Sequence, residues 1–185
     1  PRFLELNSTA PVSLNEHAFE PHYHGAERYI GLDPALAASP RLHLTGEEAV
    51  LAPGLTLAAC NRQPRRYDLG SFGLTVQEGG AFQPEDFRHE HYLLIEEAGR
   101  RVLISGCSHK GILNIVDWFR PDVLVGGFHF SGLPLDETLA GYARQLDSSG
   151  AVFYTCHCTG RPQYEFMARQ MSRLHYLSTG QTIIV

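Results

Sequence analysis

Three histidines and a cysteine stand in turns that directly follow apolar, strand-like stretches of the chain. These residues are Cys107, His109, His129 and His157. Neighbouring strands that end at one edge of a sheet bring such turns together. Imidazole and thiolate are common metal ligands, and a metal site needs three or four ligands within about 2–2.3 Å of one ion. The pattern predicts that Cys107, His109 and His157 form part of a metal site.

The segment that must position the first of these residues is Arg101–Asn114, RVLISGCSHKGILN. Its apolar and β-branched start predicts a buried strand over Arg101–Ser105. A Gly-Cys-Ser-His turn follows, and Gly111 then precedes a predicted helix over Ile112–Phe119. A polar turn between a buried strand and a helix is a usual place for chemistry in α/β proteins.

The second half of the chain alternates predicted strands and helices, whereas the first half consists of short strands and loops. The later strands are predicted over Tyr92–Glu96, Arg101–Ser105, Asp122–Gly127, Ala151–Thr155, Leu174–Leu177 and Thr182–Val185. The helices are predicted over Ile112–Phe119, Leu135–Leu146 and Pro162–Met171. In the first half, strands are predicted within Pro11–Leu14, Arg41–Thr45 and Ala49–Cys60, and loops over Asn15–Gly31, Asn61–Gly80 and Phe82–Arg88. The pattern favours an α/β (α+β) fold with functional loops at strand ends.

Composition narrows the class of protein. The 185 residues are 43% hydrophobic and 19% charged, with a net charge of −5, which is typical of one globular domain with a real core. The sequence has no basic stretch beyond Arg62–Arg66, so we expect no nucleic-acid partner. It has neither a membrane-length apolar run nor a signal peptide, so we expect no membrane partner. Four cysteines without a disulfide-like spacing favour a reduced, cytoplasmic setting.

Three motifs together resemble a known group of proteins. GCSHKGILNIV, VGGFHF and CHCTG occur in this order and are followed by a Ser-Thr-Gly and a short terminal segment. In combination they resemble the metallo-β-lactamase superfamily. Within it, they are similar to the branch of the dihydropterin–ribofuranosyl-aminobenzene phosphate synthase of methanopterin biosynthesis. The resemblance covers most of residues 1–185 and implies a single-domain αββα sandwich with a zinc site at the sheet edge.

The chain departs from that superfamily at its start. The hallmark H-x-H-x-D-H turn, which supplies most ligands of the first metal, is absent from the sequence. The first residues, PRFLELN, are typical of the end of an amphipathic helix. We therefore expect the C-terminal two-thirds of a metallo-β-lactamase domain, with the N-terminal portion missing. The hallmark turn would then lie upstream, on a separate N-terminal segment, or on another chain of a homo-oligomer.

The resemblance also implies roles for individual residues. Cys107 follows the strand where the superfamily carries an acidic metal-bridging residue, so it is a thiolate ligand or a close neighbour of the catalytic metal. His157 matches the late histidine ligand of the second metal, and His109 is the further expected ligand. His129 is either a residue that faces the substrate or a turn histidine packed under the sheet edge. Cys158 is expected beside the ligands rather than as a nucleophile.

These roles imply a metallo-hydrolase. One or two metal ions, zinc above all but also Mn²⁺ or Fe, would lower the pKa of a bound water to near 7 and polarise a carbonyl or phosphoryl oxygen. If the pterin-type chemistry applies, the metals would instead orient a phosphate-bearing small-molecule substrate. The sequence leaves these two alternatives open.

Other interpretations of the same residues stay open. The protein could be a thiol enzyme in which Cys107 is activated by the following helix N-terminus. It could be a non-catalytic module with a closed structural zinc site, made of Cys107, Cys156, His157 and Cys158. It could also be an inactive fragment. Two further histidine sets are weaker candidates: His22 and His24, expected in a polar surface or lid loop, and the middle-ligand candidates His89, Glu90 and His91.

Overall fold

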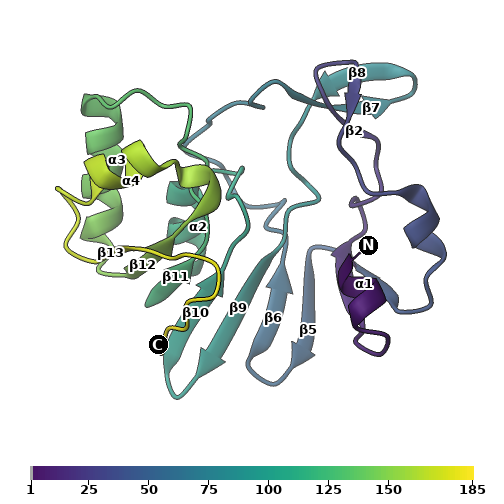
Figure 1. Ribbon diagram of the computed structural model, residues 1–185, viewed down its shortest axis with the longest axis horizontal. Coiled ribbons are helices and arrows are strands. Elements are labelled where there is room, and N and C mark those ends of the chain that lie inside the picture. Colours follow the sequence, from purple (N-terminus) through teal and green to yellow (C-terminus); the bar gives the residue numbers. More distant parts are fainter. Residues whose placement is uncertain (1) are drawn as a thin grey trace.

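The computed structural model describes residues 2–185 and contains one large sheet of seven strands (Figure 1). In order across the sheet, the strands are β13 (Leu174–Tyr176), β12 (Val152–Thr155), β11 (Val123–Val125), β10 (Arg100–Ile104), β9 (Tyr92–Glu97), β6 (Leu55–Ala58) and β5 (Glu48–Ala52). The strands from β10 to β13 run parallel to one another. The strands from β10 to β5 pair antiparallel.

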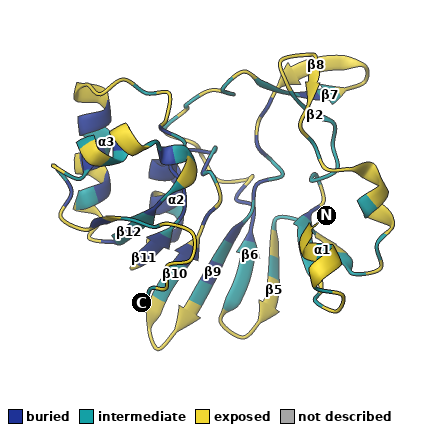
Figure 2. Ribbon diagram, in the orientation of Figure 1, coloured by how far each residue is buried: buried dark blue, intermediate teal, exposed yellow. Residues whose placement is uncertain are grey.

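Three helices connect the parallel strands. They are α2 (Ile112–Phe119), α3 (Glu137–Ser148) and α4 (Arg161–Met167). Each follows one parallel strand and precedes its neighbour. Such crossovers are almost always right-handed, so helices between strands that follow in steady order lie on the same face of the sheet. Figure 1 shows the three helices together on that face, and Figure 2 shows that the dark, buried positions concentrate there.

The core lies between these helices and the strands beneath them. Its fully buried side chains include Leu103, Ile112, Ile115, Leu124, Leu139, Phe153 and Met167. Strand alternation explains the pattern, because successive side chains of a strand point to opposite faces of the sheet. In β12, for example, Phe153 and Thr155 are buried whereas Val152 and Tyr154 are only partly so.

Local sequence sets the ends of the helices. Gly111 has a φ of 89°, which a residue with a Cβ adopts at a cost, and α2 begins directly after it. Arg120 then ends α2 in the left-handed conformation, and Pro121 follows. Asp136 caps α3 by accepting hydrogen bonds from two backbone amides of the first turn.

The first half of the chain forms smaller, more exposed elements. β1 (Val12–Asn15) and β4 (Leu42–Thr45) make a two-stranded parallel sheet. A four-stranded antiparallel sheet contains β3 (Arg28–Tyr29), β2 (His22–His24), β7 (Leu74–Glu78) and β8 (Ala81–Pro84), in that order. A short helix α1 (Arg2–Leu6) and a 3-10 helix η1 (Pro34–Ala38) complete this half.

The predicted α/β layering is confirmed, but several local predictions are wrong. Thr182–Val185 is not a strand in the structure. Asn15–Gly31, Asn61–Gly80 and Phe82–Arg88 were expected as loops, yet they contain β2, β3, β7 and most of β8. These strands have at most five residues, and β2 pairs with β7 across about fifty residues of chain. Local periodicity therefore carries little signal for them.

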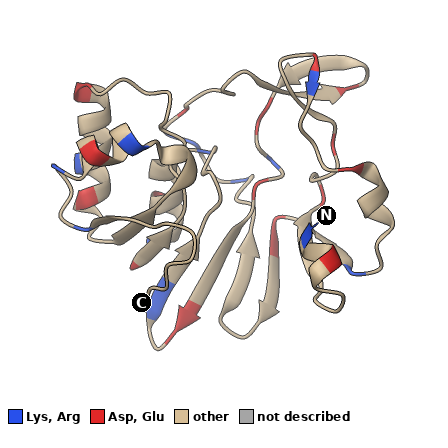
Figure 3. Cartoon of the chain, in the orientation of Figure 1, with Lys and Arg blue, Asp and Glu red and all other residues tan. Residues whose placement is uncertain are grey.

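Charges are distributed over the whole molecule rather than gathered on one element (Figure 3). Within residues 2–185, none of the helices combines the length and the apolar content that crossing a bilayer requires.

Candidate metal centre

Three turns meet at the carboxyl ends of the parallel strands of the large sheet. Hydrogen bonds join them: the amide of Gly127 donates to the carbonyl of Gly106 at 2.8 Å. The amide of Phe128 donates to Oγ1 of Thr159 at 2.9 Å. Gly127 permits this approach, because a Cβ there would lie 2.4 Å from Sγ of Cys158. The turns after β10, β11 and β12 therefore share one small space.

Into this space the turns bring Cys107, His129 and Cys158, which we call the thiol–imidazole group. The potential ligand atoms of these three residues all lie within 4.8 Å of one another. His129 has a positive φ of 54°, and Ser108, next to Cys107, has one of 61°. Such conformations cost free energy in residues with a Cβ and are concentrated at functional sites. The turns that carry Cys107 and His129 thus have a defined backbone conformation.

The thiols of this group differ in their acidity. Hydrogen bonding to Cys158 and His129 holds the pKa of Cys107 well below its usual range, with smaller contributions from the charges of His109 and His157. Hydrogen bonding to Cys107, together with burial and the negative charge of Cys107, in turn raises the pKa of Cys158. Nδ1 of His129 is buried and has no hydrogen-bond partner within residues 2–185. A thiolate, a second sulfur and an unsatisfied imidazole nitrogen together fit a soft or borderline metal ion such as zinc.

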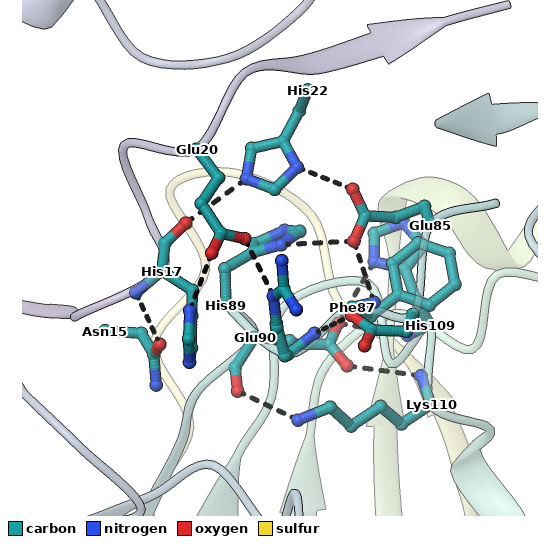
Figure 4. Close-up of polar contacts among 12 residues, drawn as sticks. Asn15, His17, Glu20, His22, Glu85, Phe87, His89, Glu90, His109 and Lys110 are labelled. Atoms are coloured by element: carbon teal, nitrogen blue, oxygen red, sulfur yellow. Dashed lines mark hydrogen bonds and ion pairs between the residues drawn. The ribbon is translucent and has the colours of Figure 1, made fainter. Parts of the chain in front are cut away.

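A buried carboxylate lies next to this group and holds His109. Glu90 accepts hydrogen bonds from Nδ1 and the backbone amide of His109, at 3.1 and 3.0 Å, and from the hydroxyl of Tyr92 at 2.6 Å. Burial alone would raise the pKa of Glu90, but these hydrogen bonds and the charge of His109 lower it to about 2. Burial lowers the pKa of His109, but Glu90 outweighs it and raises that pKa. Nε2 is then the nitrogen of His109 left for a ligand or proton (Figure 4).

His109 also connects the thiol–imidazole group to a cleft. Its ring centroid lies 4.5 Å from that of His129, and its ring stacks on Phe87 at 4.6 Å. On its other side it lines a cleft of about 460 Å³. The walls of the cleft combine apolar side chains such as Leu14, Ile30 and Leu74 with further histidines, as is typical of small-molecule sites.

The structure brings two of the predicted site residues into one group and leaves the ligand role of the others a prediction. Cys107 and His129 are in one group, and Cys158, expected only as a neighbour, is its third member. His157 is exposed at the start of the 3-10 helix η2 (His157–Thr159) and lies outside that group. The predicted metal ligation by Cys107, His109 and His157 stays a prediction. The closed structural zinc site would also need Cys156, which is not in the group.

The structure changes two other predictions, for His22 and for Glu90. His22 was expected in a polar surface loop, but it is 6% exposed on β2, where it contacts Glu85. Sequence reasoning missed it because the pairing of β2 with β7 is not local. Glu90 was a weak ligand candidate, and the structure instead shows it as the partner of His109. The sequence did offer one signal. Glu90 lies just before an apolar strand, and a glutamate buried in such a place rarely lacks a partner.

Sequence comparison finds a distant relative of this chain. No family model matches the chain. The uncharacterized protein MJ0448 of Methanocaldococcus jannaschii is 26% identical over 157 residues. The match covers 80% of this chain and 58% of that protein, so the chain spans little more than half the length of this relative.

A solved structure is similar over nearly the whole chain. It is the crystal structure of Tm1679, described as a metal-dependent hydrolase of the beta-lactamase superfamily. It matches with a TM-score of 0.82 at 23% identity, over 96% of this chain and 73% of that chain. The predicted fold is thereby confirmed: the chain has a metallo-β-lactamase-like α/β fold.

Proposed function

We propose that the protein is a metal-dependent hydrolase that acts on a small molecule bound in the cleft beside His109. The fold, shared with a metal-dependent hydrolase, supports this proposal. The observation that carries it is the thiol–imidazole group, in which two sulfur atoms and one unsatisfied imidazole nitrogen converge where the parallel strands end. Ligands in open α/β proteins usually bind at this end of the strands.

The residues that would hold the metal are Cys107, His129 and Cys158, with His109 and His157 as further predicted ligands from the same edge. Two sulfurs and a nitrogen suit zinc better than magnesium or calcium, which prefer oxygen ligands. When bound, such an ion supplies a water of lowered pKa and polarises the bond to be hydrolysed.

The chain's own residues prepare the substrate site. Glu90 fixes the orientation of His109 and keeps a hydrogen on its Nδ1, so Nε2 is free to accept or donate a proton at the cleft. Phe87 restricts the rotation of the His109 ring by stacking on it. The apolar walls of the cleft would exclude water from the flat part of a substrate.

For the substrate itself we propose a phosphate-bearing compound of the pterin type, in a cytoplasmic setting. The motifs Gly106–Lys110 and Gly126–Phe130 support this class through their resemblance to the methanopterin-related branch. The cleft supports it physically, because it offers both apolar walls and imidazoles that can donate to a phosphate oxygen.

Metal analysis combined with a hydrolysis assay tests the proposal. We expect the purified full chain to contain zinc and to hydrolyse bis(p-nitrophenyl) phosphate. Chelation should abolish this activity, and Zn²⁺ should restore it. Cys107→Ser and Cys158→Ser should lose the metal bound at the thiol–imidazole group and the activity, whereas Cys60→Ala, a buried thiol outside the group, should retain both. Full activity in metal-free protein would contradict the proposal.

One observation favours a second candidate, a thiol hydrolase in which Cys107 is the nucleophile. The pKa of Cys107 is low, and a thiolate flanked by imidazole is the arrangement that thiol enzymes use. Alkylation of Cys107 separates the two candidates. Complete inactivation while the metal remains bound would favour the thiol enzyme, and inactivation together with loss of the metal would favour the metallo-hydrolase.

A further inference from the structure

A second cluster of potential ligands borders the same cleft, and the metal site of the proposed hydrolase does not include it. It consists of His22 on β2 with Glu85 and His89, from the segment between β8 and β9, and we call it the imidazole–carboxylate group (Figure 4). Its potential ligand atoms lie within 4.8 Å of one another. Nδ1 of His22 is 2.5 Å from one oxygen of Glu85, and Nδ1 of His89 is 3.7 Å from the other.

The group is withdrawn from solvent and incompletely satisfied. The side chains of His22 and Glu85 are 7% and 2% exposed. Nδ1 of His89 is buried and lacks a hydrogen-bond partner within residues 2–185. The two imidazole rings lie with their centroids 4.2 Å apart, so both rings border the same carboxylate. A buried polar atom without a partner costs free energy, and its retention calls for an explanation such as an ion.

The orientation of His22 is that of a metal ligand. Its Nε2 lies 3.3 Å from the backbone carbonyl of His17. Because a carbonyl only accepts, Nε2 must carry the hydrogen, and in the neutral ring Nδ1 then presents a lone pair to Glu85. Two lone pairs at that distance need a cation between them, either a proton or a metal ion. Metal-bound histidines usually donate their other nitrogen to a carbonyl or carboxylate in this way.

In the described part of the chain, the residues around the group do not neutralise the charge of Glu85 with an arginine, and the adjoining cleft can admit a further ligand. Arg88, the neighbouring cation, is already paired with Glu20 and Glu78. The backbone amide of Phe87 donates to Glu85 at 2.9 Å and fixes the carboxylate. All three members of the group line the 460 Å³ cleft, so an ion held there would keep an open side.

We infer that His22, Glu85 and His89 form a second metal site, which binds a divalent transition-metal ion of the zinc class through two imidazole nitrogens and a carboxylate. Two histidines and one glutamate are a known ligand set for zinc with one open position, and the set also suits Fe²⁺. Tetrahedral ligands at about 2 Å from zinc lie about 3.3 Å apart. On metal binding, the 2.5 Å separation of His22 and Glu85 would therefore widen, and the 3.7 Å separation of His89 and Glu85 would shorten. The site stands independently of the thiol–imidazole group.

Titration with Co²⁺ distinguishes the two sites, because only a cobalt–thiolate bond gives an intense near-ultraviolet band. In the full chain we expect two bound equivalents, of which one produces the thiolate band. Glu85→Gln and His89→Gln should each remove the equivalent that lacks the band and leave the banded one. The double variant Cys107→Ser, Cys158→Ser should do the reverse. His24→Gln, on the same strand but exposed, is the matched control and should change neither.

Several results would overturn the inference. Unchanged Co²⁺ stoichiometry in Glu85→Gln would mean that the group holds a shared proton and no metal. The same conclusion would follow if the Cys107→Ser, Cys158→Ser variant bound no Co²⁺ at all. If Glu85→Gln does not fold, His89→Gln decides, because His89 is only half-buried and is not hydrogen-bonded to Glu85. Loss of the thiolate band alone would count against the proposed hydrolase site and not against this one.

Discussion

The two ligand groups of this protein lie on opposite sides of His109 and Phe87 but arise in different ways. The thiol–imidazole group stands on turns that follow neighbouring parallel strands, so the topology of one sheet brings it together. The imidazole–carboxylate group joins β2 of the small sheet to the segment that leads into β9. His22 on β2 and Glu85, directly after β8, meet because both strands pair with β7 in the small sheet. The hydrogen-bonded ends of the parallel strands hold the first group in place. The second group depends on the buried contact between His22 and Glu85, so its loss should lower the free energy of unfolding.

The largest effect is expected on the free energy of unfolding, when the imidazole–carboxylate group is disrupted. In metal-free protein, Glu85→Ala leaves His22 buried without its partner, which should cost about 3–5 kcal/mol of unfolding free energy. Urea unfolding with a chelator present measures this cost. Glu78→Ala, at an exposed ion pair, should cost no more than about 1 kcal/mol and serves as the control. A cost for Glu85→Ala as small as that of the control would show that the ion pair is not important for folding.

The next effect concerns the packing of the strand-end turns. Gly127→Ala places a Cβ against Sγ of Cys158, which should cost about 1–3 kcal/mol and displace the thiol–imidazole group. Thermal unfolding and the Co²⁺–thiolate band report the two consequences. Gly132→Ala is the matched control, because a Cβ there meets nothing within 4 Å. An undiminished band in Gly127→Ala would contradict the close packing of these turns.

A smaller effect is expected in the reactivity of the thiols. Because hydrogen bonding lowers the pKa of Cys107, this residue should be a thiolate near neutral pH, where an ordinary thiol is only a few per cent ionised. It should react with iodoacetamide about tenfold faster than an ordinary cysteine. Cys60, whose pKa burial raises to about 11, should react far more slowly. Mass spectrometry of the modified peptides measures both, and bound Zn²⁺ should protect Cys107.

The smallest effect concerns the pair of Glu90 and His109. Glu90→Gln removes the charge that raises the pKa of His109, so this pKa should fall in an NMR titration. In the wild type, the folded-state pKa of Glu90 is lowered to about 2. Its stabilising contribution is therefore present above the carboxyl's ordinary pKa and is lost as the pH falls towards 2. A His109 pKa that does not respond would show that Glu90 does not control this ring.

Much of the second half of the fold could be predicted from sequence because its signals are local. Ile112–Phe119 has an apolar face at helical spacing between Gly111 and Pro121, and the predicted helix matches α2 at both ends. The first half could not be predicted in the same way. β2 contains only three residues, and its partner β7 lies about fifty residues away. Its existence depends on a pairing that no short window of sequence contains.

The amino-acid sequence by itself determined that Cys107, His109 and His129 would stand at the ends of strands, because an apolar run followed by a polar glycine turn is a local property. Only the tertiary structure decided which of these side chains meet. It placed the ligand atom of Cys158 within 4.8 Å of that of Cys107 and left His157 exposed at the start of η2, because the turn after β12 is a 3-10 helix. It also buried His22 against Glu85, because β2 and β8 are distant in sequence and come together only by pairing with β7.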